Sequence, residues 1–181
     1  MYFKVFIYNN GLEYMENVLL KMDYRVENFS LKSRLPKIEN FKIPMQVWNR
    51  ARGKRLMPMW NDFCFEDWIG WHSNLCVTDL LTNPMRQEER IMGEIYREYF
   101  GSLSDPDLDQ KDYDRREYQK EFLKEFEDYM ELQHSDPFIC LFEGIVPKES
   151  AVYKKIKMID FPITDDEGSR AVTLISFLIA V

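Results

Sequence analysis

Residues 171–180 read AVTLISFLIA, a stretch that is apolar on both of its faces except for two hydroxyl side chains. A strand of this kind is typical of the centre of a sheet that is covered on both sides. Two more strands are predicted upstream, over residues 137–145 and 152–163, because turn-forming residues lie at 147–149 and 165–168. The last third of the chain therefore predicts three antiparallel strands joined by short, hairpin-like connections.

Two earlier strands are expected before this group. Residues 72–81 alternate well enough for a strand that contains Leu75, Val77 and Leu80, and Asn83-Pro84 then turns the chain. A short strand follows around residues 90–92, and Gly93 marks the change to a helical turn. The sequence thus predicts five strands in all.

Helices are expected between and before the strands. Residues 46–52 predict a short helix that carries Trp48 and ends at Gly53, and Asp62 is a candidate cap for a second one through Trp68. The clearest helix is predicted over residues 111–133, where Tyr118, Phe122, Phe126 and Met130 repeat every four residues. Together these elements predict an α+β fold, a five-stranded antiparallel sheet with helices packed on one face.

The first part of the chain is expected to stand apart from this sheet. Leu12, Met15, Leu19 and Met22 recur at helical spacing and predict an amphipathic helix that could form a homodimer interface. Residues 28–44 look like a connecting loop, because Pro36 and Pro44 disfavour both helix and central strand. We therefore divide the chain into an N-terminal extension over residues 1–45 and a domain over residues 46–181.

Composition limits the classes of function. Apolar residues make up 45% of the 181 residues and charged residues 30%, as in a globular protein, and the net charge is −7. An acidic chain disfavours general binding to nucleic acid or to anionic membranes. Three widely spaced cysteines, no secretory leader and no apolar run long enough to span a bilayer favour a cytoplasmic location.

Several short motifs occur in an order that resembles a bacterial family of PAS-like domains, best known from alphaproteobacteria. The motifs comprise Trp48, the turn from Gly53 to Pro58, Asp62-Phe63, Arg90-Ile91-Met92-Gly93, Phe100-Gly101, Pro162-Ile163 and residues 165–168. Met57 and Glu167 are insertions relative to the family pattern. The resemblance covers residues 46–181 and implies a PAS-like fold that binds a small ligand or cofactor, or that mediates dimerisation.

The candidate ligand-pocket residues follow from that expectation. They are Arg90, Tyr99, Tyr118, Phe122, Phe126 and His134. For Arg90 the alternative is an internal salt bridge, for the aromatic stripe it is core packing, and for His134 it is a histidine stabilised at a helix end. Likewise, the basic and aromatic residues between Trp48 and Trp60 could contact nucleic acid, but the net charge favours a solvated helix end.

No catalytic set or metal site is predicted. His72 and His134 are the only histidines, and neither stands in a ligand-spaced motif. We expect a sensory or interaction module that binds an unidentified small molecule, with no cofactor assigned, and that signals through the N-terminal helix, a homodimer or a partner protein. The alternatives are a small enzyme that uses cavity carboxylates or His134, and a purely structural adaptor.

Overall fold

A computed structural model describes residues 25–100, 127–147, 153–165, 168 and 170–181. The predicted dimer helix with Leu12, Met15, Leu19 and Met22 lies outside the described residues, as do Tyr118, Phe122 and Phe126. In chain order the elements are β1 (Arg25–Ser30), a 3-10 turn (Glu39–Phe41), α2 (Lys42–Arg52), three 3-10 turns (Trp60–Asp62, Phe65–Trp68, His72–Asn74), β2 (Leu75–Thr82), β3 (Met85–Met92), α3 (Glu94–Phe100), a helix over residues 127–135, β4 (Phe138–Pro147), β5 (Tyr153–Ile163) and β6 (Thr173–Ala180).

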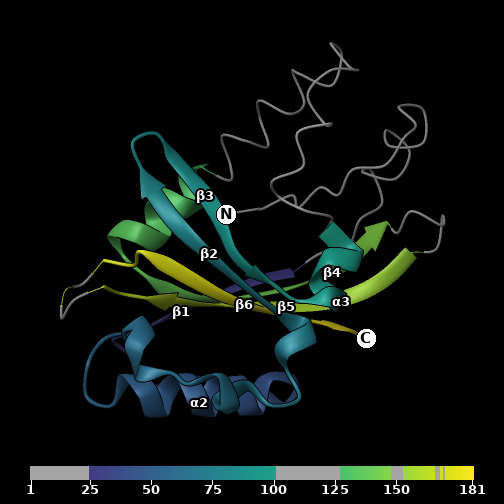
Figure 1. Ribbon diagram of the computed structural model, residues 1–181, viewed down its shortest axis with the longest axis horizontal. Helices are drawn as coiled ribbons and strands as arrows, with labels where there is room; N and C mark the ends of the chain where they lie inside the picture. Colours follow the sequence, from purple (N-terminus) through teal and green to yellow (C-terminus); the bar gives the residue numbers. More distant parts are fainter. Residues whose placement is uncertain (1–24, 101–126, 148–152, 166–167, 169) are drawn as a thin grey trace.

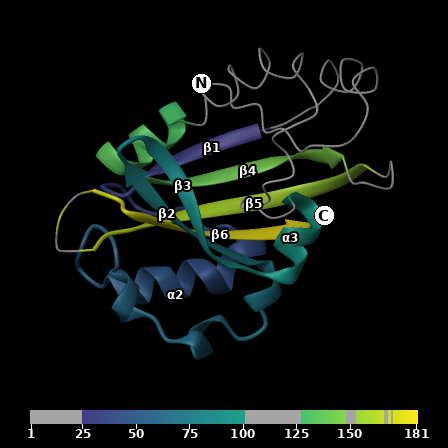
Figure 2. The same ribbon diagram turned by 45° about the horizontal axis from the view of Figure 1, so that its top comes forward.

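The fold is α+β, built on a six-stranded antiparallel sheet in the order β1-β4-β5-β6-β2-β3 (Figures 1 and 2). The predicted C-terminal meander is confirmed, since β5 pairs with β4 on one side and with β6 on the other. The β2–β3 hairpin continues the sheet from β6. β6 is therefore internal to the sheet, as its two apolar faces predict.

The prediction of five strands is wrong by one, because Arg25–Ser30 forms β1 and pairs with β4. The expected loop over residues 28–44 is accordingly wrong at its start, and the sheet includes residues from the stretch assigned to the N-terminal extension. β1 is an edge strand whose side chains are all exposed or half-buried. Such a strand carries a much weaker apolar signal than β6 does.

The same loop prediction also fails at its other end, where α2 begins at Lys42 and contains Pro44. A proline in the first turn of a helix is tolerated because its missing N–H would have no partner within the helix. The predicted end of this helix is confirmed, since Gly53 follows Arg52 at a positive φ of 57°. Glycine adopts that conformation without the strain that a Cβ atom would cause.

Helices cover both faces of the sheet, not one as predicted. Phe161 and Asp160 are neighbours in β5, so their side chains point to opposite faces. Trp48 of α2 stacks on Phe161 with 5.8 Å between ring centroids, whereas Tyr129 of the 127–135 helix hydrogen-bonds to Asp160. Figure 1 shows α2 below the sheet and the other two helices above it. Met130, the last residue of the predicted apolar stripe over 111–133, is buried, and the rest of that stripe lies outside the described residues.

The face toward α2 carries an aromatic core. Trp48 is fully buried and donates a hydrogen bond from its indole Nε1 to the carbonyl oxygen of Pro162, at 3.0 Å. Phe177 of β6 packs against Trp68 and Trp71, with centroid distances of 5.0 and 5.7 Å. These large rings bury extensive apolar surface, so this layer makes a major contribution to stability.

The opposite layer is fixed to the sheet at the end of β3. Gly93 donates its backbone N–H to the carbonyl of Leu75 at 2.7 Å. A Cβ atom at this position would lie 2.3 Å from the carbonyl oxygen of His72 and 2.5 Å from that of Ser73. Only glycine permits this close approach, which sets the direction in which α3 leaves the hairpin.

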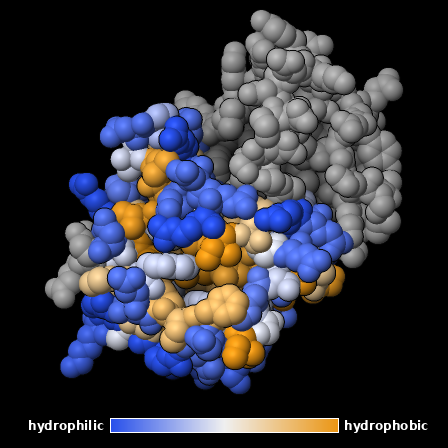
Figure 3. Space-filling model, in the orientation of Figure 1, coloured by the Kyte–Doolittle hydropathy of each residue, from blue (hydrophilic) through white to orange (hydrophobic). Residues whose placement is uncertain are grey.

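Apolar side chains also reach the surface. Phe65 and Ile69 are 72% and 71% exposed. Figure 3 shows hydrophobic patches among mainly hydrophilic residues on the face in view. None of the helices in the described ranges combines the length and the apolar character needed to cross a lipid bilayer.

Candidate functional site

The sheet face opposite α2 carries a row of polar side chains at its centre. The register places Cys140 of β4 opposite Asp160 of β5, Asp160 opposite Ser176 of β6, and Ser176 opposite Cys76 of β2. Directly paired residues share a face of the sheet, so the four side chains form one line across four strands. All four are buried.

Asp160 is the central member of this row. Its residue is 6% exposed, and its Oδ2 accepts a hydrogen bond from the Tyr129 hydroxyl at 2.6 Å. Its other oxygen, Oδ1, is buried and has no hydrogen-bond partner among the described residues. Burial raises the pKa of Asp160, although the hydroxyls of Ser176 and Tyr129 oppose the rise. A buried carboxyl with an empty acceptor position is costly for folding, which makes it a candidate for function.

The helix over residues 127–135 supplies the neighbours above Asp160. Gln133 is completely buried and donates from Nε2 to the Tyr129 hydroxyl oxygen at 2.9 Å. Gln133 also accepts a bond from the backbone N–H of Phe138 at 3.4 Å, which ties the helix to the start of β4. Tyr129 and Gln133 are four residues apart, so they lie on the same side of the helix. This chain of bonds holds the phenol in place over the carboxyl group.

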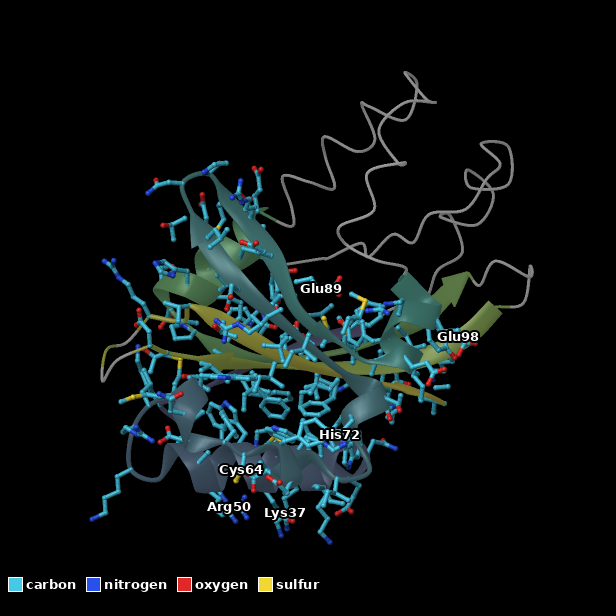
Figure 4. The ribbon with its side chains drawn as sticks, in the orientation of Figure 1. Lys37, Arg50, Cys64, His72, Glu89 and Glu98 are labelled. Carbon is cyan, nitrogen blue, oxygen red and sulfur yellow. The ribbon has the colours of Figure 1, made fainter. Side chains whose placement is uncertain are left out.

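A second carboxylate lies on the same face. Glu89 of β3 is paired with Thr78 of β2. Because Thr78 lies two residues after Cys76, the side chains of Thr78 and Glu89 are on the same face of the sheet as Cys76. Glu89 Oε1 lies 3.6 Å from the Arg97 guanidinium of α3, while its Oε2 is buried and no described residue forms a hydrogen bond with it. Figure 4 shows Glu89 on the side of the sheet away from α2. We call Asp160, Glu89, Tyr129, Gln133 and Ser176 the acidic cluster.

The thiols of Cys76 and Cys140, beside the acidic cluster, are poor nucleophiles. Burial raises the pKa of Cys76 to about 12, and the nearby carboxylates of Glu89 and Asp160 act in the same direction. Burial likewise raises the pKa of Cys140. A thiol is a nucleophile only as its thiolate, so neither cysteine is poised for covalent catalysis.

The acidic cluster is suited to accept hydrogen bonds. Two of its carboxyl oxygens have no hydrogen-bond partner within the described ranges, and the Tyr129 phenol already uses its proton in its bond to Asp160. An amine, amidine or other N–H donor would satisfy these oxygens. Among the residues that the structure describes, no three His, Cys, Asp or Glu side chains are grouped as a metal site.

Of the predicted pocket residues the structure describes Arg90, Tyr99 and His134, and the first two lie on opposite faces of the sheet. Arg90 pairs with Asp79, with Nη2 and Oδ1 2.8 Å apart, and its guanidinium lies 5.2 Å from the centre of the Trp60 ring. The internal salt bridge weighed for Arg90 is therefore present. Asp79 also accepts a bond from the Thr173 hydroxyl at 2.8 Å, on the α2 face of the sheet. Tyr99 of α3, in contrast, is buried on the other face.

His134 takes part in a backbone contact. Its Nδ1 lies 2.7 Å from the carbonyl oxygen of Ala171, and its own carbonyl accepts the Ala171 N–H at 3.2 Å. These two bonds hold the end of the helix against Ala171, which lies just before β6. Within the described ranges, the hydrogen bonds of His134 join it to Ala171 and not to the acidic cluster, although Tyr129 and Gln133 belong to the same helix.

Sequence reasoning missed all five members of the acidic cluster. The signal for Asp160 was present, because a lone carboxylate lies between Ile159 and Phe161 in a strand of apolar character. The argument that a charged residue within an apolar strand needs a partner was applied to Arg90 alone. Tyr129 and Gln133 gave no such signal, since both are common on amphipathic helices.

No protein-family model, curated protein or solved structure matches this chain.

Proposed function

We propose that this chain is a PAS-like sensory module that binds a small molecule over the acidic cluster and signals through a dimer or partner contact. The observation that carries the proposal is the buried Oδ1 atom of Asp160, for which the described part of the chain supplies no hydrogen-bond partner. A protein that needed only stability would gain by an apolar residue at this position. Retaining the carboxyl group is explained if a ligand completes its hydrogen bonds.

The arrangement of elements supports the PAS-like part of the proposal. Two strands, a helical segment and a three-strand meander follow one another along the chain, and the first hairpin pairs with the last strand. The motifs that resemble the family include Trp48 and Pro162, which the hydrogen bond between them brings together. β1 is an addition to the expected five strands.

The chemistry of the acidic cluster defines the ligand class. Two unsatisfied carboxyl oxygens, one each on Asp160 and Glu89, favour a small molecule with N–H donors such as an amine or an amidine. Binding would also act on the 127–135 helix, because Tyr129 already bonds to Asp160 and Gln133 to Tyr129. This helix therefore offers a route from the ligand to a partner surface.

The test is a ligand-detected NMR screen of the purified chain with a panel of small amines, amidines and amino-substituted heterocycles, preceded by native mass spectrometry for a copurifying molecule. We expect at least one compound to bind. The variant Asp160→Asn removes the charge with little change in shape, and it should weaken that binding by about tenfold or more.

The matched control is Asp79→Asn, which alters a carboxylate on the other face of the same sheet. It should leave ligand affinity unchanged although it breaks the ion pair with Arg90. If no compound binds and no extra mass copurifies, the proposal fails and the chain is better described as a structural adaptor. Equal affinity of the wild-type chain and Asp160→Asn would remove the acidic cluster as the site.

A further inference from the structure

A groove lies on the α2 side of the molecule, away from the acidic cluster. It is formed between the segment over residues 33–39 and one side of α2, and its volume is about 560 Å³. Small-molecule sites in proteins commonly fall within roughly 300–1,000 Å³. The groove is thus of a size that suits a small ligand.

The lining of this groove is strongly basic. Arg34 and Lys37 come from the segment before α2, and Lys42 and Arg52 come from the helix itself. Glu39 is the only carboxylate in the lining. Four cations and one anion give the groove a charge of +3, whereas the whole chain carries −7. Positive charge is therefore concentrated in this groove, although the chain as a whole is acidic.

Among the described residues, these four cations have no ion-pair partner of the kind that neutralises Arg50. Within the described ranges, no carboxylate lies within ion-pair distance of Arg34, Lys37, Lys42 or Arg52. Arg50, only two residues before Arg52, pairs with Asp67, so the two arginines of one helix have different environments. Figure 4 shows Lys37 and Arg50 beyond α2, on the side away from Glu89.

Arg52 is held in a defined position. Its guanidinium lies 5.1 Å from the centre of the Trp48 ring, and its Nε donates to Asn49 Oδ1 at 3.0 Å. The terminal nitrogens of the guanidinium engage no acceptor among the described residues. Partial burial lowers the pKa of Arg52, since the cation is drawn from water without an opposite charge. A guanidinium that is held in place, with both terminal nitrogens available to donate, is well suited to bind an oxyanion.

We infer that this groove binds a small molecule carrying at least two phosphate or carboxylate groups. Arg52 would contact one acidic group, and the cations of the 33–39 segment would contact the other across the groove. Gln46 and Asn49 supply neutral hydrogen-bonding side chains between them, and Met45 supplies apolar contact. This site is separate from the acidic cluster, so either can fail without the other.

The experiment is calorimetric titration of the full chain at low salt with pyrophosphate, citrate and ATP as probes. Pyrophosphate and citrate separate phosphate from carboxylate recognition, and ATP tests a larger phosphate ligand. We expect saturable binding of at least one probe, weakened about tenfold by Arg52→Gln and less by Lys37→Gln. Added salt should weaken binding, because the contacts are exposed to solvent.

Two further variants make the result decisive. Glu39→Gln removes the only negative charge of the lining and should tighten binding, a gain that an unfolded protein could not show. Lys54→Gln makes the same change of charge as Lys37→Gln at an exposed residue outside the lining, and it should leave affinity within about twofold. Circular dichroism of each variant verifies that it is folded.

The inference is overturned if none of the three probes binds to the wild-type chain. It is also overturned if Lys54→Gln weakens binding as much as Arg52→Gln, since attraction would then reflect general surface charge. Unchanged affinity in folded Arg52→Gln would exclude the groove as the site. Binding of pyrophosphate or ATP without citrate would assign the groove to phosphate ligands.

Discussion

The two faces of the sheet are buried by different kinds of side chain. On the α2 face, Trp48, Phe161 and Phe177 pack ring against ring, and the one indole N–H of Trp48 is satisfied by a carbonyl. On the other face, Asp160 and Glu89 each have a buried oxygen that no described residue satisfies with a hydrogen bond. Burial of rings stabilises the fold, whereas burial of unpaired carboxyl oxygens destabilises it.

This difference separates stability from function. The α2 face can be explained by packing alone, because its groups are apolar or paired. The acidic cluster cannot be explained in that way, since an apolar residue would serve the core better than Asp160. Removing the Trp48 ring and neutralising Asp160 should therefore change stability in opposite directions.

The largest effect is expected on the aromatic face. Trp48→Ala removes a fully buried side chain, its stacking on Phe161 and its hydrogen bond to Pro162. We expect the free energy of unfolding to fall by about 3–5 kcal/mol, as measured by urea denaturation. The control is Phe65→Ala, an exposed aromatic whose loss should change stability by no more than about 0.5 kcal/mol. Equal effects of both variants would show that the α2 face does not anchor the core.

Asp160→Asn should act in the opposite direction. The folded state raises the pKa of Asp160 above its ordinary value of 3.8, so the folded chain binds a proton more tightly than the unfolded chain does. The contribution of this residue to stability therefore falls as pH rises from 3.8 to the raised pKa of the folded state. The Asp160→Asn variant does not lose stability in this way, because an amide does not titrate in this pH range.

We expect the two chains to be about equally stable in acid, where Asp160 is protonated in both the folded and unfolded states. Near neutral pH, Asp160→Asn should be more stable than wild type by about 1–3 kcal/mol. The difference in unfolding free energy between the two chains is taken at each pH. The contributions of the other carboxylates then cancel, including that of Glu143, whose pKa is lowered by Lys155 and Lys157. A variant that is less stable than wild type at neutral pH would contradict the assignment of Asp160 as a strained, functional group.

A smaller effect is expected from Tyr129→Phe, which removes the hydroxyl that bonds to Asp160 at 2.6 Å. The loss should destabilise the chain by about 1–2 kcal/mol, because the carboxyl group then has still fewer partners. In the Asp160→Asn background the same change should matter less, since the acceptor is neutral. A double-mutant cycle measures this coupling, and additive effects would show that the two groups act independently.

The sequence predicted the centre of the sheet better than its edges. β6 was recognised because it is apolar on both faces, and this character depends only on local sequence. β1 was missed because an edge strand with one half-buried face resembles a polar connection. Pro44 was taken as evidence against a helix, but its position in the first turn of α2 removes the conflict.

The candidate site was less accessible to prediction. Arg90 and Asp160 look alike in the sequence, because each is a charged residue among apolar neighbours. In the structure Arg90 forms an ion pair with Asp79, whereas Asp160 is buried and one of its oxygens has no hydrogen-bond partner in the described part of the chain. Only the three-dimensional partners distinguish the two cases. For the groove, the sequence favoured a solvated helix end for the basic residues around Arg52, and their position beside Arg34 and Lys37 depends on how the 33–39 segment lies along α2.

The smallest perturbation is chemical labelling of the three cysteines, which reports whether the polar face is closed in the native chain. Cys64 is exposed on the α2 side, whereas Cys76 and Cys140 are buried beside Asp160. Because burial raises the pKa of Cys76 to about 12, its thiolate is nearly absent at mildly alkaline pH. Iodoacetamide should therefore add one label to the folded chain and three after denaturation, as counted by intact mass. Rapid labelling of Cys76 or Cys140 in the native chain would mean that this face opens to solvent, whereas a ligand over the acidic cluster should slow any residual labelling of both.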